Sequence, residues 1–399
     1  MNPTNTRFTP LDFFVDPDGP ICYGILKPGE NHPGGIPIIK VKNIIGGKIL
    51  EDNLLFTSPE IHKQYKRAEV KGGDLLLTIR GTTGRVAIVP KTLTGANITQ
   101  DTARIRVSSN DSPTYVYYAL QSPDIQRQIE LNTVGQAVKG INIGEVKKLS
   151  IYHPARTEQE GIARILSTWD LAITTTDQLI TRCQQQKNAL MAQLLSGTKR
   201  FSGFSEQWKK KPITNCLVAS SLRNSNSQLG IDEVMSVNKS LGMIPMREQT
   251  IGKTIDRYKV VKNGWFAYNP MRINVGSICR WNGENDCLVS PDYVVFSCDE
   301  NVILTSYFDQ FRKSERWADY MNRAGNGSVR VRIYFNDLSK LEISLPPVNE
   351  QHKIASILDA ADCEIETLQQ KLTCLKQEKK SLMQQLLTGK RRVKEVAAL

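Results

Sequence analysis

Apolar residues recur at alternating steps of four and three in two long segments of the chain, at 158–195 and 350–387. This spacing places them along one side of an α-helix and is the seam pattern of a coiled coil. Polar residues fill most other positions, with Gln, Lys and Glu most frequent in the second segment, which predicts polar outer faces. The first seam is Ile162, Leu166, Trp169, Ile173, Thr176, Ile180, Cys183, Leu190 and Leu194, and the second is Ile354, Leu358, Ala361, Ile365, Leu368, Leu372, Leu375, Leu382 and Leu386.

Both segments are expected to form uninterrupted helices. Neither contains Pro or Gly at 162–195 or 354–387, and each ends at a glycine, Gly197 or Gly389, that can close the last turn with a positive φ. A helix of roughly 38 residues is about 57 Å long at 1.5 Å per residue. With one apolar stripe each, the helices are predicted to pack on each other. The alternative is that each packs on its own neighbouring domain.

The two helical segments are copies of one another. The motif that begins at Glu158-Gln159 returns 192 residues later at Glu350-Gln351, and 26 of 66 positions agree without a gap between 135–200 and 327–392. A unit of about half the chain has therefore been duplicated. Two similar halves suit a target that also has two parts.

The segments before the helices show a different pattern, with short β-branched or aromatic runs broken by Gly, Pro and Asn. We predict α+β globular domains at 1–150 and 201–345, separated by the repeat helices at 151–200 and 346–399. Helices are expected to begin at Ser122-Pro123-Asp124, where Ser is the cap, and at Ser314. The predicted strands lie at 36–41, 74–79, 104–107, 264–268 and 293–296.

The charge balance favours an anionic partner. The formal net charge is +12 and the pI is about 9.2, and clustered Lys and Arg bind phosphates with release of counterions. An ordinary basic protein is the alternative. No apolar run has the length of a membrane span, so we expect a cytoplasmic protein. The eight Cys and four His show no metal-ligand spacing, and we expect reduced thiols and no metal site.

Polar residues at corresponding loops of the two domains are candidates for contacts with DNA. Arg80 and Arg272 each follow a predicted strand and precede a Gly by four residues. Arg can bind guanine bidentately, and Asn or Gln can bind adenine. Ordinary loop residues and surface salt bridges are the alternative. The base candidates are Arg80, Thr82, Thr83, Arg85, Gln100, Asn269, Arg272 and Asn274, and the phosphate candidates are Lys40, Lys42, Asn43, Gln136, Lys139, Arg330 and Arg332.

Catalytic motifs are incomplete in this chain. Asn269-Pro270-Met271 lacks the second Pro and the aromatic residue of an amino-methyltransferase turn. Gly252-Lys253-Thr254 lacks the first Gly of a phosphate-binding loop. Pro123-Asp124 with Glu145-Val146-Lys147 matches a nuclease pattern only loosely. We therefore expect no catalytic role, with a duplicated nuclease or methyltransferase as a weaker alternative.

Two motifs resemble the specificity subunit of type I restriction-modification enzymes. One is Leu345-Pro346-Pro347-Xaa-Xaa-Glu350-Gln351 leading into a helix that closes at Leu-Leu-Thr-Gly, and the other runs from Arg200 to Trp208 as Arg-Phe-Ser-Gly-Phe-Ser-Xaa-Xaa-Trp. The residues before Gly35 lack a copy of the second motif, so the start of the first domain stays open.

The resemblance implies two target-recognition domains, each bound to one half of a split, asymmetric site on double-stranded DNA. The two helices would form an antiparallel spacer. This chain would be non-catalytic and without a cofactor. Two methyltransferase subunits carrying S-adenosylmethionine, and restriction subunits using ATP and Mg, would be its partners. The main alternative is an interaction scaffold whose coiled coil joins proteins and whose basic charge is incidental.

Overall fold

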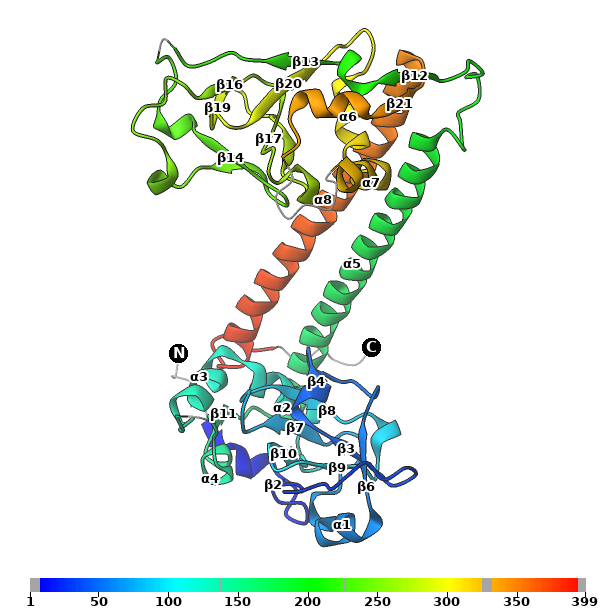
Figure 1. Ribbon diagram of the computed structural model, residues 1–399. Coiled ribbons are helices and arrows are strands. Elements are labelled where there is room, and N and C mark those ends of the chain that lie inside the picture. Colours follow the sequence, from blue (N-terminus) through cyan, green and yellow to red (C-terminus); the bar gives the residue numbers. More distant parts are fainter. Residues whose placement is uncertain (1–7, 137, 226, 325–331, 394–399) are drawn as a thin grey trace. The chain divides into compact units, whose positions relative to one another are not determined.

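The computed structural model describes residues 8–136, 138–225, 227–324 and 332–393, which form two compact units. Unit 1 contains the chain up to residue 177 and from residue 371, and unit 2 contains residues 178–370. Each unit holds one globular domain and one part of each long helix, α5 (Arg156–Ser196) and α8 (Val348–Leu386) (Figure 1).

The long helices pair in both units, as predicted. In unit 1 the first turns of α5, with Ile162 and Leu166, share a buried cluster with the last turns of α8, with Met383 and Leu386. In unit 2 the last turns of α5 share a cluster with the first turns of α8. The helices are therefore antiparallel. The same clusters include side chains of the globular domains, so each helix pair also packs on its own domain.

Both helices end where the sequence predicted. Gly197 and Gly389 have φ values of +76° and +70° and follow the last helical turns. A residue with a Cβ is strained in this conformation, so glycine is required there.

In each helix one position of the predicted seam lacks an apolar residue, and a lysine occupies it. Lys187 lies between Cys183 and Leu190, with only 5% of its side chain exposed. Its Nζ atom donates to Asp362 Oδ1 at 2.5 Å. The repeat-related Lys379 donates to Asp170 Oδ1 at 2.6 Å in unit 1. A polar residue at a single seam position specifies the register of a coiled coil, and these two pairs do so here.

Each seam aspartate also contacts the neighbouring globular domain. Gln310 Nε2 donates to Asp362 Oδ2 at 2.9 Å in unit 2, and Tyr118 Oη donates to Asp170 Oδ2 at 2.7 Å in unit 1. Burial raises the pKa of Asp362, but hydrogen bonds from Gln310 and Lys187 and the nearby charges outweigh it and hold that pKa below its usual range. The aspartates therefore fix each domain to its helix pair.

Lys187→Ala is expected to lower the free energy of unfolding by about 1.5 to 3 kcal/mol, because it removes a charged hydrogen bond from a buried seam. The loss stays in that range because Asp362 keeps Gln310 and Lys313 as partners. Urea unfolding followed by circular dichroism measures it. Arg182→Ala, at an exposed position of the same helix, is the control and should change stability by less than about 0.5 kcal/mol. Equal effects of the two substitutions would contradict a structural role for the seam lysine.

The globular part of unit 1 is built on a four-stranded antiparallel sheet in the order β2-β10-β7-β8. Its strands are β2 (Cys22–Tyr23), β10 (Thr102–Ile105), β7 (Leu75–Thr78) and β8 (Val86–Ile88). The other strands are β1 (Phe8–Pro10), β3 (Ile36–Ile39), β4 (Ile44–Ile45), β5 (Lys48–Ile49), β6 (Leu55–Thr57), β9 (Asn97–Ile98) and β11 (Ser150–Tyr152), and the helices are α1 (Pro59–Gln64), α2 (Pro113–Gln121), α3 (Pro123–Leu131) and α4 (Ile143–Lys147).

Unit 2 has an equivalent sheet in the order β13-β20-β17-β18. Its strands are β13 (Leu217–Ser220), β20 (Val294–Cys298), β17 (Phe266–Tyr268) and β18 (Ile278–Arg280). The other strands are β12 (Lys209–Pro212), β14 (Met235–Asn238), β15 (Gly242–Pro245), β16 (Lys259–Val261), β19 (Cys287–Val289) and β21 (Glu342–Leu345), and the helices are α6 (Thr305–Phe311) and α7 (Glu315–Ala324). The predicted α+β class is confirmed, and every predicted strand overlaps an observed one.

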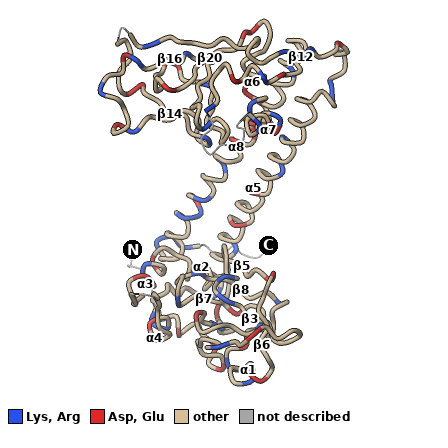
Figure 2. The backbone as a smooth tube through the Cα atoms, in the orientation of Figure 1, with Lys and Arg blue, Asp and Glu red and all other residues tan. Residues whose placement is uncertain are grey.

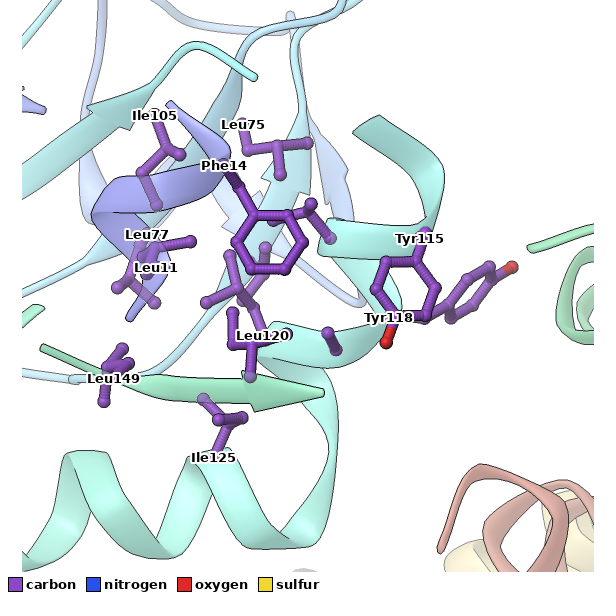
Figure 3. Close-up of a cluster of buried hydrophobic side chains, with 14 of the residues drawn as sticks. Leu11, Phe14, Leu75, Leu77, Ile105, Tyr115, Tyr118, Leu120, Ile125 and Leu149 are labelled. Atoms are coloured by element: carbon purple, nitrogen blue, oxygen red, sulfur yellow. The ribbon is translucent and has the colours of Figure 1, made fainter. Parts of the chain in front are cut away.

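The main core of unit 1 lies between its own sheet, β2-β10-β7-β8, and its helices. Figure 3 shows part of it, where Phe14, Leu75 and Leu120 belong to one fully buried cluster. The predicted cap of α3 is observed, because Ser122 Oγ accepts a hydrogen bond from Ile125 N at 3.3 Å. Ser314 caps α7 in the same way, accepting from Trp317 N at 3.3 Å.

Strand pairing shows which segment of the first domain corresponds to β12 of the second. Leu11 N donates to Leu149 O at 2.8 Å, and Ile213 N donates to Leu341 O at the same distance. Leu149 and Leu341 are 192 residues apart, so Leu11 and Ile213 are equivalent. The segment from β1 through the 3-10 turn Leu11–Phe14 therefore opens the first domain as β12 opens the second.

The Glu and the Gln of the dipeptide near the start of each repeat helix make different contacts. Gln159 and Gln351 are buried. Gln159 Oε1 accepts from Ser112 N, and Gln351 Oε1 accepts from Leu304 N, both at 2.9 Å. Gln159 thus holds the segment that leads into α2, and Gln351 holds the segment that leads into α6. The glutamates instead accept hydrogen bonds from arginines just beyond the C-terminal end of the other repeat helix, Arg392 for Glu158 and Arg200 for Glu350.

Candidate nucleic-acid interface

The loop after β7 brings three of the predicted contact residues together. Arg80 is exposed, and its Nη1 atom donates to Gln100 Oε1 at 3.3 Å. Gly81 N donates to Lys139 O at 2.9 Å, which places Lys139 and Gly140 beside Arg80. Gly81 and Gly84 have φ values of +73° and +87°, so the tight turn requires glycine there.

The parallel pairing of β3 and β9 places one more candidate, Lys40, near Gln100. Ile39 pairs with Ile98 in the parallel ladder of β3 and β9, so Lys40 and Gln100 follow strands that end together. Lys42 is exposed. Asn43 is buried, and its Oδ1 atom accepts from Lys40 N at 3.1 Å. Its side chain therefore holds the turn rather than facing solvent.

The remaining candidates of unit 1 lie on exposed loops. Arg85 is exposed, and its Nη1 atom donates to Ile44 O at 3.1 Å. Thr82 and Gln136 are exposed and Thr83 is half-buried. Within the described part of unit 1, no carboxylate forms an ion pair with Lys40, Lys42, Arg80, Arg85 or Lys139.

The corresponding loop of unit 2 is held by one side-chain and one backbone acceptor. Asn269 Oδ1 accepts from Met271 N at 3.0 Å, and Arg272 O accepts from Ser277 N at 3.0 Å. Arg272 and Asn274 are exposed, and Gly276 closes the turn with a φ of +93°.

The second phosphate-candidate segment lies beside this loop. Ile333 N donates to Pro270 O at 3.0 Å, which places the exposed Arg332 there. Arg330 lies outside the described residues.

One predicted equivalence needs correction. At a constant shift of 192, Arg80 matches Arg272 in the sequence. In the structure, however, Ile79 O accepts from Ile141 N, and Pro270 O accepts from Ile333 N. Ile141 and Ile333 are 192 residues apart, whereas Ile79 and Pro270 are 191 apart. The backbone counterpart of Arg80 is therefore Met271, because the unit 2 loop is one residue longer.

A hollow of about 570 Å³ in unit 2 adds residues that the sequence did not single out. Asn269 and Arg272 line it together with the β14–β15 hairpin. Arg247, Tyr258 and Tyr293 also line it, so a cationic group and two aromatic rings face the same space. No local motif marks these three, because they come together only when the hairpin folds over the sheet.

Charged side chains are spread over both units. Figure 2 shows Lys and Arg on loops, strands and helices of both domains. Across residues 8–393, leaving out the gaps given above, no cluster of His, Cys, Asp and Glu is arranged to hold a metal. In the same residues no helix has the length and apolarity to cross a membrane. Glu145 and Lys147 of the loose nuclease pattern pair with Lys148 and Asp12.

Comparison with known proteins agrees with these observations. The family model described as type I restriction modification DNA specificity domain matches residues 25–184 and 271–377, which is more than half of the chain. The type I restriction enzyme EcoBI specificity subunit of Escherichia coli is 29% identical over 209 residues, or 52% of this chain. That match spans only 44% of the Escherichia coli protein.

Two other similarities extend over nearly the whole chain. The type I restriction enzyme MjaX specificity subunit of Methanocaldococcus jannaschii is 25% identical, covering 90% of this chain and 88% of its own length. A crystal structure of the S subunit of a type I restriction-modification system from M. genitalium superimposes with a TM-score of 0.61 and 15% identity. It covers 97% of this chain and 98% of that structure. The chain belongs to the type I restriction modification DNA specificity domain family.

Proposed function

We propose that this chain is the non-catalytic subunit that recognises DNA in a type I restriction-modification complex, and that each globular domain reads one half of a split, asymmetric site. One observation carries the proposal. The family model matches both halves of the chain, and in each half an exposed arginine lies on a glycine-closed loop after a central strand of the sheet.

The chemistry of these loops supports base reading. Arg80 and Arg272 are exposed and their charges are not neutralised by carboxylates of the described chain. An exposed guanidinium can form two parallel hydrogen bonds to guanine O6 and N7. Gln100 and Asn274 supply amides for adenine beside them. Lys40, Lys42, Lys139 and Arg332 would bind phosphates, which sets the register of the protein on the duplex.

Partner subunits complete the proposal. Two methyltransferase subunits would dock on this chain and carry S-adenosylmethionine, and restriction subunits would supply ATP- and Mg-dependent cleavage. Such a complex would act on DNA in the cytoplasm. The chain itself would contribute sequence selection and the spacing between half-sites, and no catalytic group.

Alanine substitution of the two loop arginines tests the proposal. The target is first found by purifying the chain with its bound subunits and mapping methylated adenines in the host genome. Arg80→Ala and Arg272→Ala are each expected to cost about 1 to 3 kcal/mol in binding and to relax selection in one half-site only. The measurement is the affinity for duplexes in which each half-site is varied separately.

Lys148→Ala is the matched control, because Lys148 is exposed and paired with Glu145 away from the loops. Equal loss of affinity on every sequence would assign the arginines to phosphates instead of bases. Binding to mixed DNA that does not depend on salt would favour the interaction scaffold, since phosphate contacts give a steep salt dependence.

A further inference from the structure

Unit 1 has a basic hollow that is separate from the loop candidates. It has a volume of about 380 Å³, within the range of small-ligand pockets. Arg104 lies on β10, and Arg106 follows the end of that strand. Arg80 lies instead beside Asp101, at the start of β10. The lining residues are Asp18, Pro20, Ile21, Cys22, Lys66, Arg67, Glu69, Lys71, Arg104 and Arg106.

Three of the five cations in the hollow lack a carboxylate partner. Lys66 pairs with Glu69, and Arg106 Nη2 pairs with Asp74 Oδ2 at 2.7 Å. Within the described part of unit 1, Arg67, Lys71 and Arg104 form no ion pair. The hollow therefore has excess positive charge.

Arg104 has bonding capacity that the chain does not use. Only 3% of the residue is exposed, and its Nη2 and Nη1 atoms donate to Pro20 O at 2.9 Å and Glu69 O at 3.4 Å. Its buried Nε atom has no hydrogen-bond partner in the described chain. Leaving a charged donor buried and unpaired costs free energy. An anion near this guanidinium would offset that cost.

We propose that the hollow binds a phosphate group, with Arg104 at its floor and Arg67 and Lys71 at its rim. Guanidinium and ammonium groups bind phosphate through short, charge-assisted hydrogen bonds. Arg67 and Lys71 are exposed and can reach a ligand from solvent. The phosphate could come from the backbone of DNA or from the free ion in solution. The DNA version of this proposal rests on the proposed function, and the free-ion version does not.

The test uses the full chain with its co-purifying subunits and the double substitution Arg67→Ala/Lys71→Ala. Both side chains are exposed, so the fold should be kept, and thermal melting checks this. Titration calorimetry with inorganic phosphate measures the free ion. Fluorescence anisotropy of a mixed-sequence duplex, repeated over a series of KCl concentrations, measures DNA.

If the ligand is a DNA phosphate, the double variant should bind all sequences more weakly and the salt slope should fall by about one. If it is free phosphate, the Kd for inorganic phosphate should rise at least about tenfold while the DNA salt slope stays the same. Arg104→Lys, which keeps the charge but loses the fork, should weaken whichever binding is observed.

The control is again the exposed Lys148→Ala, which removes one positive charge where the double variant removes two. Phosphate affinity and salt slope that do not differ between wild type, the double variant and this control would overturn the proposal. Failure of this proposal can be told apart from failure of the proposed function. If the proposed function fails, Arg80→Ala and Arg272→Ala leave the sequence preference unchanged, while the phosphate titration still measures whether the hollow binds phosphate.

Discussion

Glu350→Ala is expected to lower the free energy of unfolding of unit 2 by about 3 to 5 kcal/mol, because it removes one partner of a buried ion pair. Glu350 is fully buried. Its carboxylate accepts from Arg200 Nε at 3.0 Å and Nη2 at 2.7 Å, and from Trp208 Nε1 at 3.1 Å. Without it, a guanidinium that is only 24% exposed and an indole N–H lose their acceptor.

The repeat supplies a graded comparison for this prediction. Glu158 makes the equivalent pair with Arg392, whose side chain is 55% exposed. Water can solvate Arg392 when its partner is removed, so Glu158→Ala should cost less than Glu350→Ala. Glu160→Ala, which breaks an exposed pair with Arg156, should cost less than about 1 kcal/mol.

Urea unfolding followed by circular dichroism ranks the three variants. Tryptophan fluorescence adds a local probe, because Trp208 contacts Glu350 directly. If Glu350→Ala and Glu160→Ala unfold at the same urea concentration, the buried pair does not stabilise unit 2.

Local pattern was sufficient for the helices and their ends. The seam residues near the helix ends, the two closing glycines and the serine caps each depend on side chains within a few positions, and the structure confirms them. The gaps at Lys187 and Lys379 were also visible in the heptads. The ion-pair partners of these lysines could not be predicted, because Asp362 and Asp170 are more than 170 residues away in the chain.

Contacts that form only in the folded chain decided what the sequence left open. Asn43 was a candidate for a phosphate contact, and the structure shows its side chain bonded to Lys40 N and Leu50 O in the 40–50 turn. Equivalent residues before the Arg272 loop are 191 residues apart rather than 192. The extra residue lies in the loop, because loops tolerate insertions that paired strands do not. No local motif distinguishes Arg104 from other strand residues, because only the folded chain places it beside Arg67 and Lys71.

Removal of one heptad from each long helix is expected to shorten the preferred gap between half-sites by about three base pairs, if the proposed function holds. Seven residues at 1.5 Å each remove about 10 Å of helix, and a base pair rises about 3.4 Å. Residues 176–182 of α5 and 368–374 of α8 are equivalent under the repeat, so both helices lose the same part. The original site should then be methylated poorly, because the two domains no longer meet both half-sites together.

The deletion must be seven residues long for a physical reason. A heptad keeps the seam in phase, so Lys187 still meets Asp362 and Lys379 still meets Asp170. A four-residue deletion rotates the later seam positions away from the partner helix and should lower stability as well as activity. Methylation of a library of sites with gaps of every length measures the preference. An unchanged preferred gap in the heptad variant would show that the helix pair does not set the distance between the two reading domains.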